Sequence, residues 1–329
     1  MIAGCQANGG AKKTDSNPSR QNMDLAKFLI AQNLPTVETV ESWNSGFADG
    51  LKIQTIHYEV FTALKDPLML RDVPAFLENC QSNFRKLFSK SPSEVERFQI
   101  YLFDNRTQWQ VFTAGFAGRE SQIYSQIKAG AYYLKSCCIA YNIGRERTFY
   151  ALGHECWHQF ADKNFKFSLP SWLNEGLAMQ FEANIYKDGL FYFVPGENFN
   201  RLDMLNKSIE QNQIIPLETL LETDPGELLG NDRKLSAFYS ECYALVRFLQ
   251  DSDGGKSKEA FNRLLKDGLD GKWSLSNGDR IVAADKNRPL TVGWNKKIGP
   301  QLFKLYFGSD IKTIEKEFMD FCSDISRKK

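Results

Sequence analysis

Residues 154–158 read His154-Glu155-Cys156-Trp157-His158, an H-E-x-x-H run that uses two of the three histidines in the 329-residue chain. On an α-helix, residues four positions apart lie on one face and one turn apart, so both imidazoles can bind the same metal ion. Imidazole nitrogen is a common ligand of zinc. The glutamate between them lies at the edge of that face, where it can act as general base on a metal-activated water. We therefore expect one Zn²⁺ ion on this helix.

A third ligand is expected from the segment that follows the motif. If the first helix ends near residue 163 and a second begins at Ser171 as N-cap, an antiparallel return brings Glu175 level with His158. Two imidazoles and one carboxylate leave the fourth position of tetrahedral zinc for water, as in catalytic sites. The segment reads Leu169-Pro170-Ser171-Trp172-Leu173-Asn174-Glu175-Gly176-Leu177-Ala178.

These two motifs together resemble the gluzincin metallopeptidases, whose third zinc ligand is a glutamate on the helix after H-E-x-x-H. Upstream, Gly130-Ala131-Tyr132-Tyr133 and the apolar stretch that runs to Tyr141 are similar to the bacterial peptidase MA-like proteins, many of them of unknown function. The resemblance covers roughly residues 50–325 and is strongest over 130–185. It implies that His154, His158 and Glu175 bind the zinc and that Glu155 is the catalytic base.

Two features of the gluzincin pattern are missing from the chain. No G-A-M-E-N-like run is present to capture the amino terminus of a substrate, so we expect an endopeptidase and not an aminopeptidase. Met179 stands where the aspartate of an E-x-x-x-D pattern would be. Glu182, seven residues after Glu175, is then the candidate that orients an imidazole, with a solvated helix glutamate as the alternative.

A tetrahedral oxyanion formed at zinc needs a second hydrogen-bond donor besides the metal. Tyr239 is the first candidate for that donor and Tyr243, one turn further on, is the second; a structural role is the alternative for both. The remaining histidine, His57, lies in a predicted strand and is expected to pack there and not to bind metal.

The periodicity of apolar residues predicts an α+β fold, in which a zincin-like domain with a small mixed sheet packed on the H-E-x-x-H helix is followed by a mostly α-helical C-terminal subdomain. The motif helix itself carries an apolar stripe that should press against the sheet, formed by Phe149, Leu152, Cys156 and Phe160. Strands are expected over residues 51–64, 98–103 and 133–141, and helices over 76–88, 217–229, 235–249 and 310–325, the last with Ser309 as N-cap.

These elements suggest a flexible tether over 1–22, a catalytic subdomain over 50–196 and a helical subdomain over 197–329. The strand over 133–141 is expected at the edge of the sheet, where an extended peptide can pair with it through main-chain hydrogen bonds. That placement predicts a protein or peptide substrate. A plain interior strand is the alternative, because this segment is largely apolar.

Composition excludes several classes of partner. With 42% hydrophobic and 25% charged residues and a net charge of +1, the chain is typical of a globular protein and is not basic enough to indicate nucleic-acid binding. No apolar run approaches the roughly 18 residues of a transmembrane span.

The amino terminus indicates a possible attachment to the bacterial envelope. Ile2-Ala3-Gly4-Cys5 resembles a lipobox, so a lipid anchor at Cys5 and an extracytoplasmic location are expected. The charged and hydrophobic regions of a signal peptide are missing, which leaves a cytoplasmic location as the alternative. The other six cysteines do not fix the redox compartment.

The sequence therefore predicts a zinc-dependent peptidase that hydrolyses peptide bonds with metal-activated water and Glu155 as general base. Two alternatives remain open. One is a zinc hydrolase that acts on a substrate other than a peptide, and the other is a non-catalytic interaction module stabilised by zinc. The intact Glu155 disfavours the second, because a structural metal site needs no base.

Overall fold

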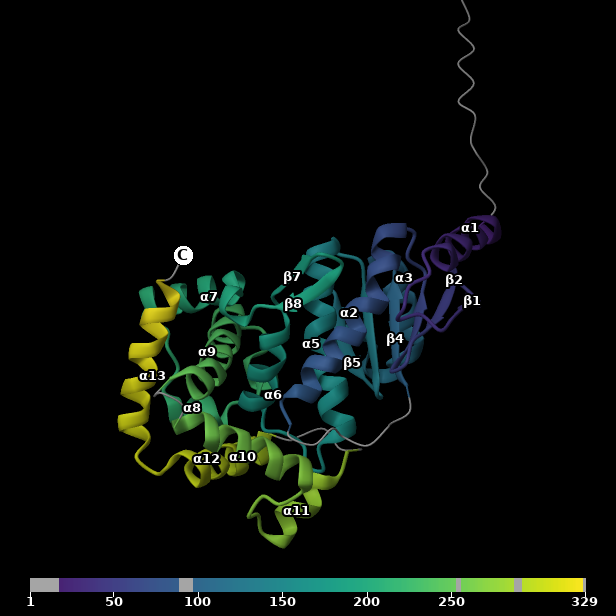
Figure 1. The fold of residues 1–329 in the computed structure, drawn as a ribbon. Helices are drawn as coiled ribbons and strands as arrows, with labels where there is room; N and C mark the ends of the chain where they lie inside the picture. Colours follow the sequence, from purple (N-terminus) through teal and green to yellow (C-terminus); the bar gives the residue numbers. More distant parts are fainter. Residues whose placement is uncertain (1–17, 89–96, 253–255, 287–291, 328–329) are drawn as a thin grey trace, which may run out of the picture.

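A six-stranded mixed sheet forms the first half of the fold in the computed structural model, which describes residues 18–88, 97–252, 256–286 and 292–327 (Figure 1). Its strands are β1 (Thr39–Asn44), β2 (Asp49–Gln54), β3 (Tyr58–Thr62), β4 (Phe98–Phe103), β5 (Ala131–Leu134) and β6 (Cys137–Tyr141). They are ordered β1-β2-β3-β4-β6-β5, with β3, β4 and β6 parallel and the other neighbours antiparallel. The expected α+β class with a mixed sheet is confirmed, and the sheet already begins at Thr39, upstream of the predicted start at residue 50.

Helices cover both faces of this sheet. The helix α5 (Arg145–Asn164) and the helix α2 (Pro67–Lys86) pack in the main core with alternate residues of β6, among them Ala140. Ile139 points the other way, into a second cluster with Trp109 of the helix α3 (Arg106–Phe116). The motif helix is therefore held against one face of the sheet, as its sequence predicts.

The apolar stripe of α5 is buried as expected. Phe149, Leu152, Cys156 and Phe160 are each at most 2% exposed, and Trp157 is fully buried, where its ring stacks on Phe181. Burial of four such side chains stabilises the helix by several kcal/mol, at about 1.5–3 kcal/mol for a large apolar residue. The helix that carries His154 and His158 is thus a rigid part of the core.

The segment predicted as one strand over 133–141 is a hairpin. Residues Lys135 and Ser136 have positive φ angles of 49° and 62° and turn the chain between β5 and β6. Tight two-residue turns of this kind usually contain Asn or Gly, so Lys135 and Ser136 carry no turn signal. As a result β5 is the edge strand, and β6 lies inside the sheet between β4 and β5.

The segment predicted as one strand over 51–64 is likewise two strands, β2 and β3. The turn between them is held by Glu78 of α2, whose carboxylate accepts hydrogen bonds from the Thr55 hydroxyl and the His57 backbone N–H. The imidazole Nδ1 of His57 lies 2.7 Å from the same carboxylate. A turn fixed by a distant helix leaves no local signal. His57 therefore lies in this turn and pairs with Glu78, and does not pack within a strand as expected.

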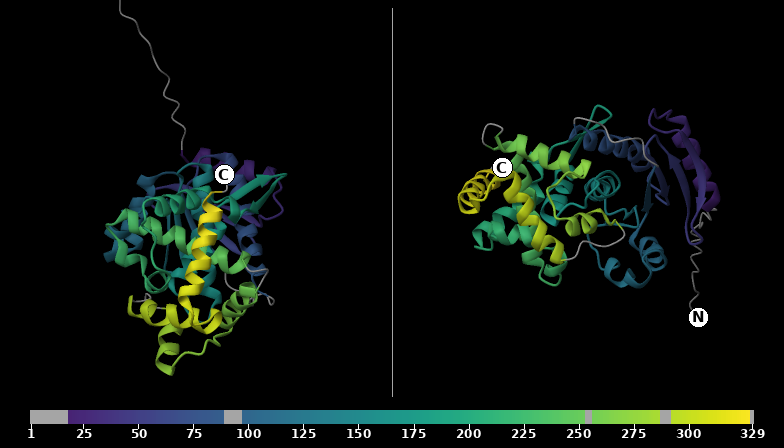
Figure 2. Two further views of the ribbon diagram at one scale, coloured as in Figure 1. Left: turned by 90° about the vertical axis from the view of Figure 1, so that its left-hand side faces the viewer. Right: turned by 90° about the horizontal axis from the view of Figure 1, so that it is seen from below.

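The second half of the chain is mainly helical, and it begins with the helix that carries Glu175. The helix α9 (Asp232–Asp251) is central to it, because α6, α7, α8, α10 and α13 all contact it. The elements are α6 (Ser171–Ala178), β7 (Asn184–Lys187), β8 (Leu190–Phe193), α7 (Phe199–Glu210), α8 (Leu217–Glu222), α10 (Lys256–Asp270), α11 (Asn277–Ala284), α12 (Val292–Phe307) and α13 (Ile311–Ser326). The helix α13 lies on the outer surface of this half, on the side away from the sheet (Figures 1 and 2).

Three shorter features complete the described chain. The helix α1 (Pro18–Ala31) packs beside β1 and β2, α4 (Ser121–Tyr124) follows α3, and short 3₁₀ turns lie at Gly118–Glu120, Met179–Phe181, Pro195–Glu197 and Pro225–Leu228. The predicted flexible tether over 1–22 is thus helical in its described part, which begins at Pro18. Cys5 lies outside the described residues. In the part of the chain that the structure describes, no helix combines the length and apolarity of a membrane span.

Two helix starts differ by one residue from the sequence prediction. Asp310, and not Ser309, is the N-cap of α13, because its side chain accepts the backbone N–H of Thr313. Ser171 is the first helical residue of α6 and not its N-cap, which is Pro170. A proline side chain cannot accept a hydrogen bond, so this helix start needs a partner from elsewhere.

Candidate metal centre

The helix α5 presents His154 and His158 on the side that faces α6. Their ring centroids are 4.8 Å apart, and both side chains are largely shielded from solvent, with exposures of 14% and 12%. The opposite side of α5 is the buried apolar stripe, so the helix cannot rotate without exposing that stripe to water. The packing of α5 therefore fixes the direction in which both imidazoles point.

The helix α6 brings Glu175 to the two imidazoles. Its first backbone N–H, at Ser171, donates to the Asn295 side chain of α12 at 2.8 Å, and Asn295 in turn donates to Asp224 at 2.8 Å. Further along α6, Gly176 lies against the backbone carbonyl of Cys242 in α9. The position of the short helix is thus set by contacts with the helical half of the chain.

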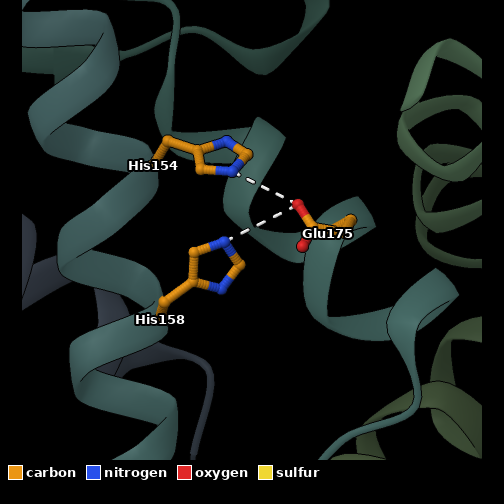
Figure 3. A group of neighbouring side chains, drawn as sticks. All are labelled: His154, His158 and Glu175. Carbon is orange, nitrogen blue, oxygen red and sulfur yellow. Dashed lines mark ion pairs between the residues drawn. The ribbon is translucent and has the colours of Figure 1, made fainter. Parts of the chain in front are cut away.

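The side chains of Glu175, His154 and His158 point toward one another. The carboxylate oxygen Oε2 of Glu175 lies 3.3 Å from Nε2 of His154 and 3.6 Å from Nε2 of His158 (Figure 3). Zinc bonded to nitrogen and oxygen at about 2.0–2.2 Å in a tetrahedron holds its ligand atoms about 3.3–3.6 Å apart. The spacing therefore fits Zn²⁺, and the trio could hold a metal ion.

A second observation also fits a cation at this point. Oε2 of Glu175 is buried and makes no hydrogen bond of good geometry with any described residue, although it lies between two imidazole nitrogens. A buried carboxylate oxygen that accepts no hydrogen bond costs free energy in general, and a cation bound between the three side chains would offset that cost. No other group of three His, Cys, Asp or Glu side chains converges in this way among the described residues.

The electrostatics of the trio favour positive charge. Burial lowers the pKa of His154, but the Glu175 and Glu182 carboxylates outweigh it and raise the pKa to about 10. Burial raises the pKa of Glu175, yet the two imidazoles hold it well below its usual range. Protons and a metal cation compete for the same nitrogen and oxygen atoms, so a site that stabilises imidazolium also attracts a divalent cation.

Glu155 lies beside this centre. Burial is the main cause of the raised pKa of its carboxyl group, while the neighbouring His154 and His158 act in the opposite direction. A carboxyl group whose pKa is shifted upward toward neutrality accepts and releases protons more readily at physiological pH, which is what a general base requires. The structure thus brings the three predicted ligands together, and Glu155 is the neighbour of His154 on the same helix.

Glu182 contacts the His154 imidazole, as the sequence suggested. Its Oε1 lies 3.0 Å from Nδ1 of His154, and the side chain is only 6% exposed, so the alternative of a solvated helix glutamate is wrong. The carboxylate is also bound by Arg201 and Asn198 of the α7 segment, and Arg201 holds the pKa of Glu182 well below its usual range against the effect of burial. Neither Arg201 nor Asn198 was anticipated from the sequence, where no spacing rule links them to the motif.

The two candidate tyrosines differ in their surroundings. The hydroxyl of Tyr243 donates to the backbone carbonyl of Pro195 at 2.5 Å and accepts from Arg247, so it is engaged away from the trio. The pKa of Tyr239 is raised, first by burial and then by the charge of Glu175. The ring of Tyr239 lies under the guanidinium of Arg201, 5.5 Å from its centroid, whereas the hydroxyl of Tyr243 is engaged in hydrogen bonds with Pro195 and Arg247.

Comparison of the chain with models of known protein families and with curated protein sequences gives no match. The chemistry of the site must therefore be derived from the side chains around Glu175.

Proposed function

We propose that the protein is a zinc-dependent endopeptidase of the gluzincin type, with a zincin-like arrangement of sheet and helices. The observation that carries the proposal is the approach of both Nε2 atoms, from His154 and His158, to one oxygen of Glu175 directly beside Glu155. Two neutral imidazoles and one carboxylate are the ligand set of catalytic zinc, which leaves a position for water.

Glu155 is the proposed proton carrier. When bound, Zn²⁺ supplies Lewis acidity, which lowers the pKa of water and polarises a carbonyl oxygen. Glu155 accepts the proton of the attacking water and passes it to the leaving amine, a role that its buried position and raised pKa suit. Tyr239 is the proposed hydrogen-bond donor to the oxygen that gains negative charge.

The substrate is proposed to be an extended peptide that pairs with β5. This strand ends the order of the sheet, and it runs along α5, where the Tyr133 hydroxyl donates to Asp162 at 2.7 Å. Asp162 is four residues after His158 and thus one turn away on a similar face of the helix. A peptide added to the β5 edge would pass beside the metal-binding side chains, with main-chain hydrogen bonds holding it.

The test is the substitution Glu155→Gln, which keeps the size of the side chain and removes its basicity. We expect bound zinc, measured by metal analysis of the purified protein, to remain at one per chain, and casein hydrolysis to fall by about 10²–10⁴-fold. Glu146→Gln on the exposed side of the same helix is the matched control and should retain activity.

Two outcomes count against the proposal. A parent protein that binds no zinc would remove its basis. Casein hydrolysis by Glu155→Gln at the parent rate would exclude Glu155 as the base, and with it the peptidase mechanism.

A further inference from the structure

The carboxylate of Glu182 is held by contacts to both of its oxygens. Oε1 lies 3.0 Å from Nδ1 of His154 and accepts from Nη2 of Arg201 at 2.5 Å. Oε2 accepts from Nε of Arg201 and from Nδ2 of Asn198, each at 2.8 Å. The Arg201 fork therefore grips both oxygens, which fixes the plane of the carboxylate as well as its position.

Arg201 is itself held in place. It lies in the first turn of α7, where Asn198 is the N-cap, and its guanidinium is 5.5 Å from the ring centroid of Tyr239 in α9. A planar guanidinium over an aromatic face is attracted to the ring, by about 0.5–2 kcal/mol in general. Its side chain is 16% exposed, so the ion pair with Glu182 is little screened by solvent.

This arrangement bears directly on the state of His154. A carboxylate that accepts a hydrogen bond from Nδ1 selects the imidazole tautomer with its proton on Nδ1, which leaves the lone pair on Nε2 for a metal. A carboxylate free to rotate would select neither the ring orientation nor the tautomer as strictly. The Arg201 guanidinium and the Asn198 amide prevent the Glu182 carboxylate from rotating.

We propose that Arg201 and Asn198 are positioning residues that act through Glu182 to aim Nε2 of His154 at the metal. The inference rests on the proposed zinc site and extends that site to the helix α7. This helix belongs to the helical half of the chain and itself carries none of the three proposed ligands. The guanidinium of Arg201 also lies over the ring of Tyr239, the proposed donor to the oxyanion.

A buried ion pair can also serve stability alone. The Arg145–Asp72 pair, which joins α5 to α2 and touches none of the three ligands, is such a contact. A purely structural Arg201 would lower the stability of the apoprotein when replaced, and would leave the metal affinity of the folded protein unchanged. Metal affinity therefore separates the two roles.

The experiment compares Zn²⁺ and Co²⁺ binding by the full chain and its Arg201→Met variant in competition with a chromophoric chelator. We expect the dissociation constant for Zn²⁺ to rise by about 10–100-fold, as is usual when a residue that orients a metal-bound histidine is lost. The visible absorption of bound Co²⁺ should change as well, because it reports ligand geometry. Arg247→Met is the matched control, since Arg247 is 17% exposed and pairs with Asp251 away from the trio.

A second variant guards against a failure to fold. Arg201→Lys keeps the positive charge beside Glu182, but an ammonium group cannot bind both oxygens in the manner of the guanidinium fork. We expect it to fold and still to bind Zn²⁺ several-fold more weakly than the parent. Unchanged Zn²⁺ affinity in both Arg201 variants would overturn the inference.

A double-mutant cycle tests whether Arg201 acts through Glu182. Once Glu182→Gln has been introduced, Arg201→Met should weaken Zn²⁺ binding much less than it does in the parent, because the residue that transmits its effect has been replaced. Additive effects would overturn the proposed route. Failure of the parent itself to bind Zn²⁺ is a different result, since it removes the proposed function and with it the basis of the inference.

Discussion

Tyr239 and Tyr243 lie one turn apart on α9, and their side chains have different surroundings. The Tyr243 hydroxyl satisfies the Pro195 carbonyl and is bound by Arg247. Tyr239 instead packs against the guanidinium of Arg201 within the electrostatic influence of Glu175 and Glu155. The pair thus offers a matched comparison between a proposed catalytic tyrosine and a structural one.

The substitution Tyr239→Phe should reduce kcat for casein hydrolysis by about 10²–10³-fold, the usual cost of one oxyanion donor. Zn²⁺ affinity should stay within a few-fold of the parent value, because the proposed ligands are His154, His158 and Glu175. Tyr243→Phe should lower the urea midpoint, since the Pro195 carbonyl loses one of its two donors and Arg247 loses an acceptor, and should leave kcat near the parent value. Equal kcat values for parent and Tyr239→Phe would remove Tyr239 from the mechanism.

The residues of the site divide into those that a local pattern reveals and those that it does not. His154, Glu155 and His158 were predictable because helical spacing alone puts them together. Glu175 was within reach because only a short connection separates α5 from α6. The role of Arg201 could not be predicted, because its approach to Glu182 depends on how α7 packs on α9, which is a tertiary contact.

The same division holds for whole elements. The strand β4 and the helix α13 were predicted close to their observed bounds, and so was the end of α5, because each has its own apolar period. The hairpin β5–β6 was read as a single strand because Lys135 and Ser136 take positive φ angles without a glycine or asparagine. Turns that lack the residues usually found in them are therefore what sequence periodicity missed.

Close helix packing is the element-scale feature on which Glu175 depends. A Cβ atom added to Gly176 would meet the backbone carbonyl oxygen of Cys242 at 2.5 Å and a methyl group of Val246 at 2.5 Å. Neither the α9 backbone nor a β-branched side chain in a buried helix can easily retreat. The absence of a side chain at 176 thus lets α6 approach α9 and places the adjacent Glu175.

Gly176→Ala should therefore destabilise the fold by about 1–3 kcal/mol and weaken Zn²⁺ binding, because α6 must move away from α9 and take Glu175 with it. The urea midpoint and the Zn²⁺ dissociation constant measure the two effects. Gly115→Ala is the control: an added Cβ there meets no atom within 4 Å, so helix propensity alone should stabilise α3 by up to about 1 kcal/mol. An unchanged Zn²⁺ affinity in Gly176→Ala would show that α6 is not placed by this contact.

At the scale of the whole molecule, the sheet half and the helical half share one core. A single buried cluster extends from Leu51 in β2 through Phe160 in α5 to Ile325 in α13. His154, His158 and Glu175, which together could hold a metal ion, lie where the halves meet: the two histidines are on α5 and the glutamate is on α6, which packs on α9. The sequence could indicate the two kinds of structure, but not that their apolar faces would merge.

The buried carboxyl group of Glu241 should make the stability of this shared core depend on pH. It lies in α9, fully shielded from solvent, and its two oxygens face the backbone N–H of Ile215 at 3.2 and 3.1 Å. Burial raises the pKa of Glu241 from 4.5 to about 8, although the Ile215 N–H opposes the shift. Between these two pH values the folded state retains a proton that the unfolded state has lost.

The stability of the whole fold should therefore decrease as pH rises from about 4.5 to 8, by up to about 1.4 kcal/mol per pH unit from this group, and the loss from it should level off above pH 8. Glu241→Gln removes the ionisation and keeps an oxygen for the Ile215 N–H, so its free energy of unfolding should exceed that of the parent by a margin that grows across the same window. Urea unfolding at pH 5, 6.5 and 8 measures that margin, with the exposed Glu317→Gln of α13 as control. A constant difference between parent and Glu241→Gln at all three pH values would show that Glu241 is already ionised in the folded core.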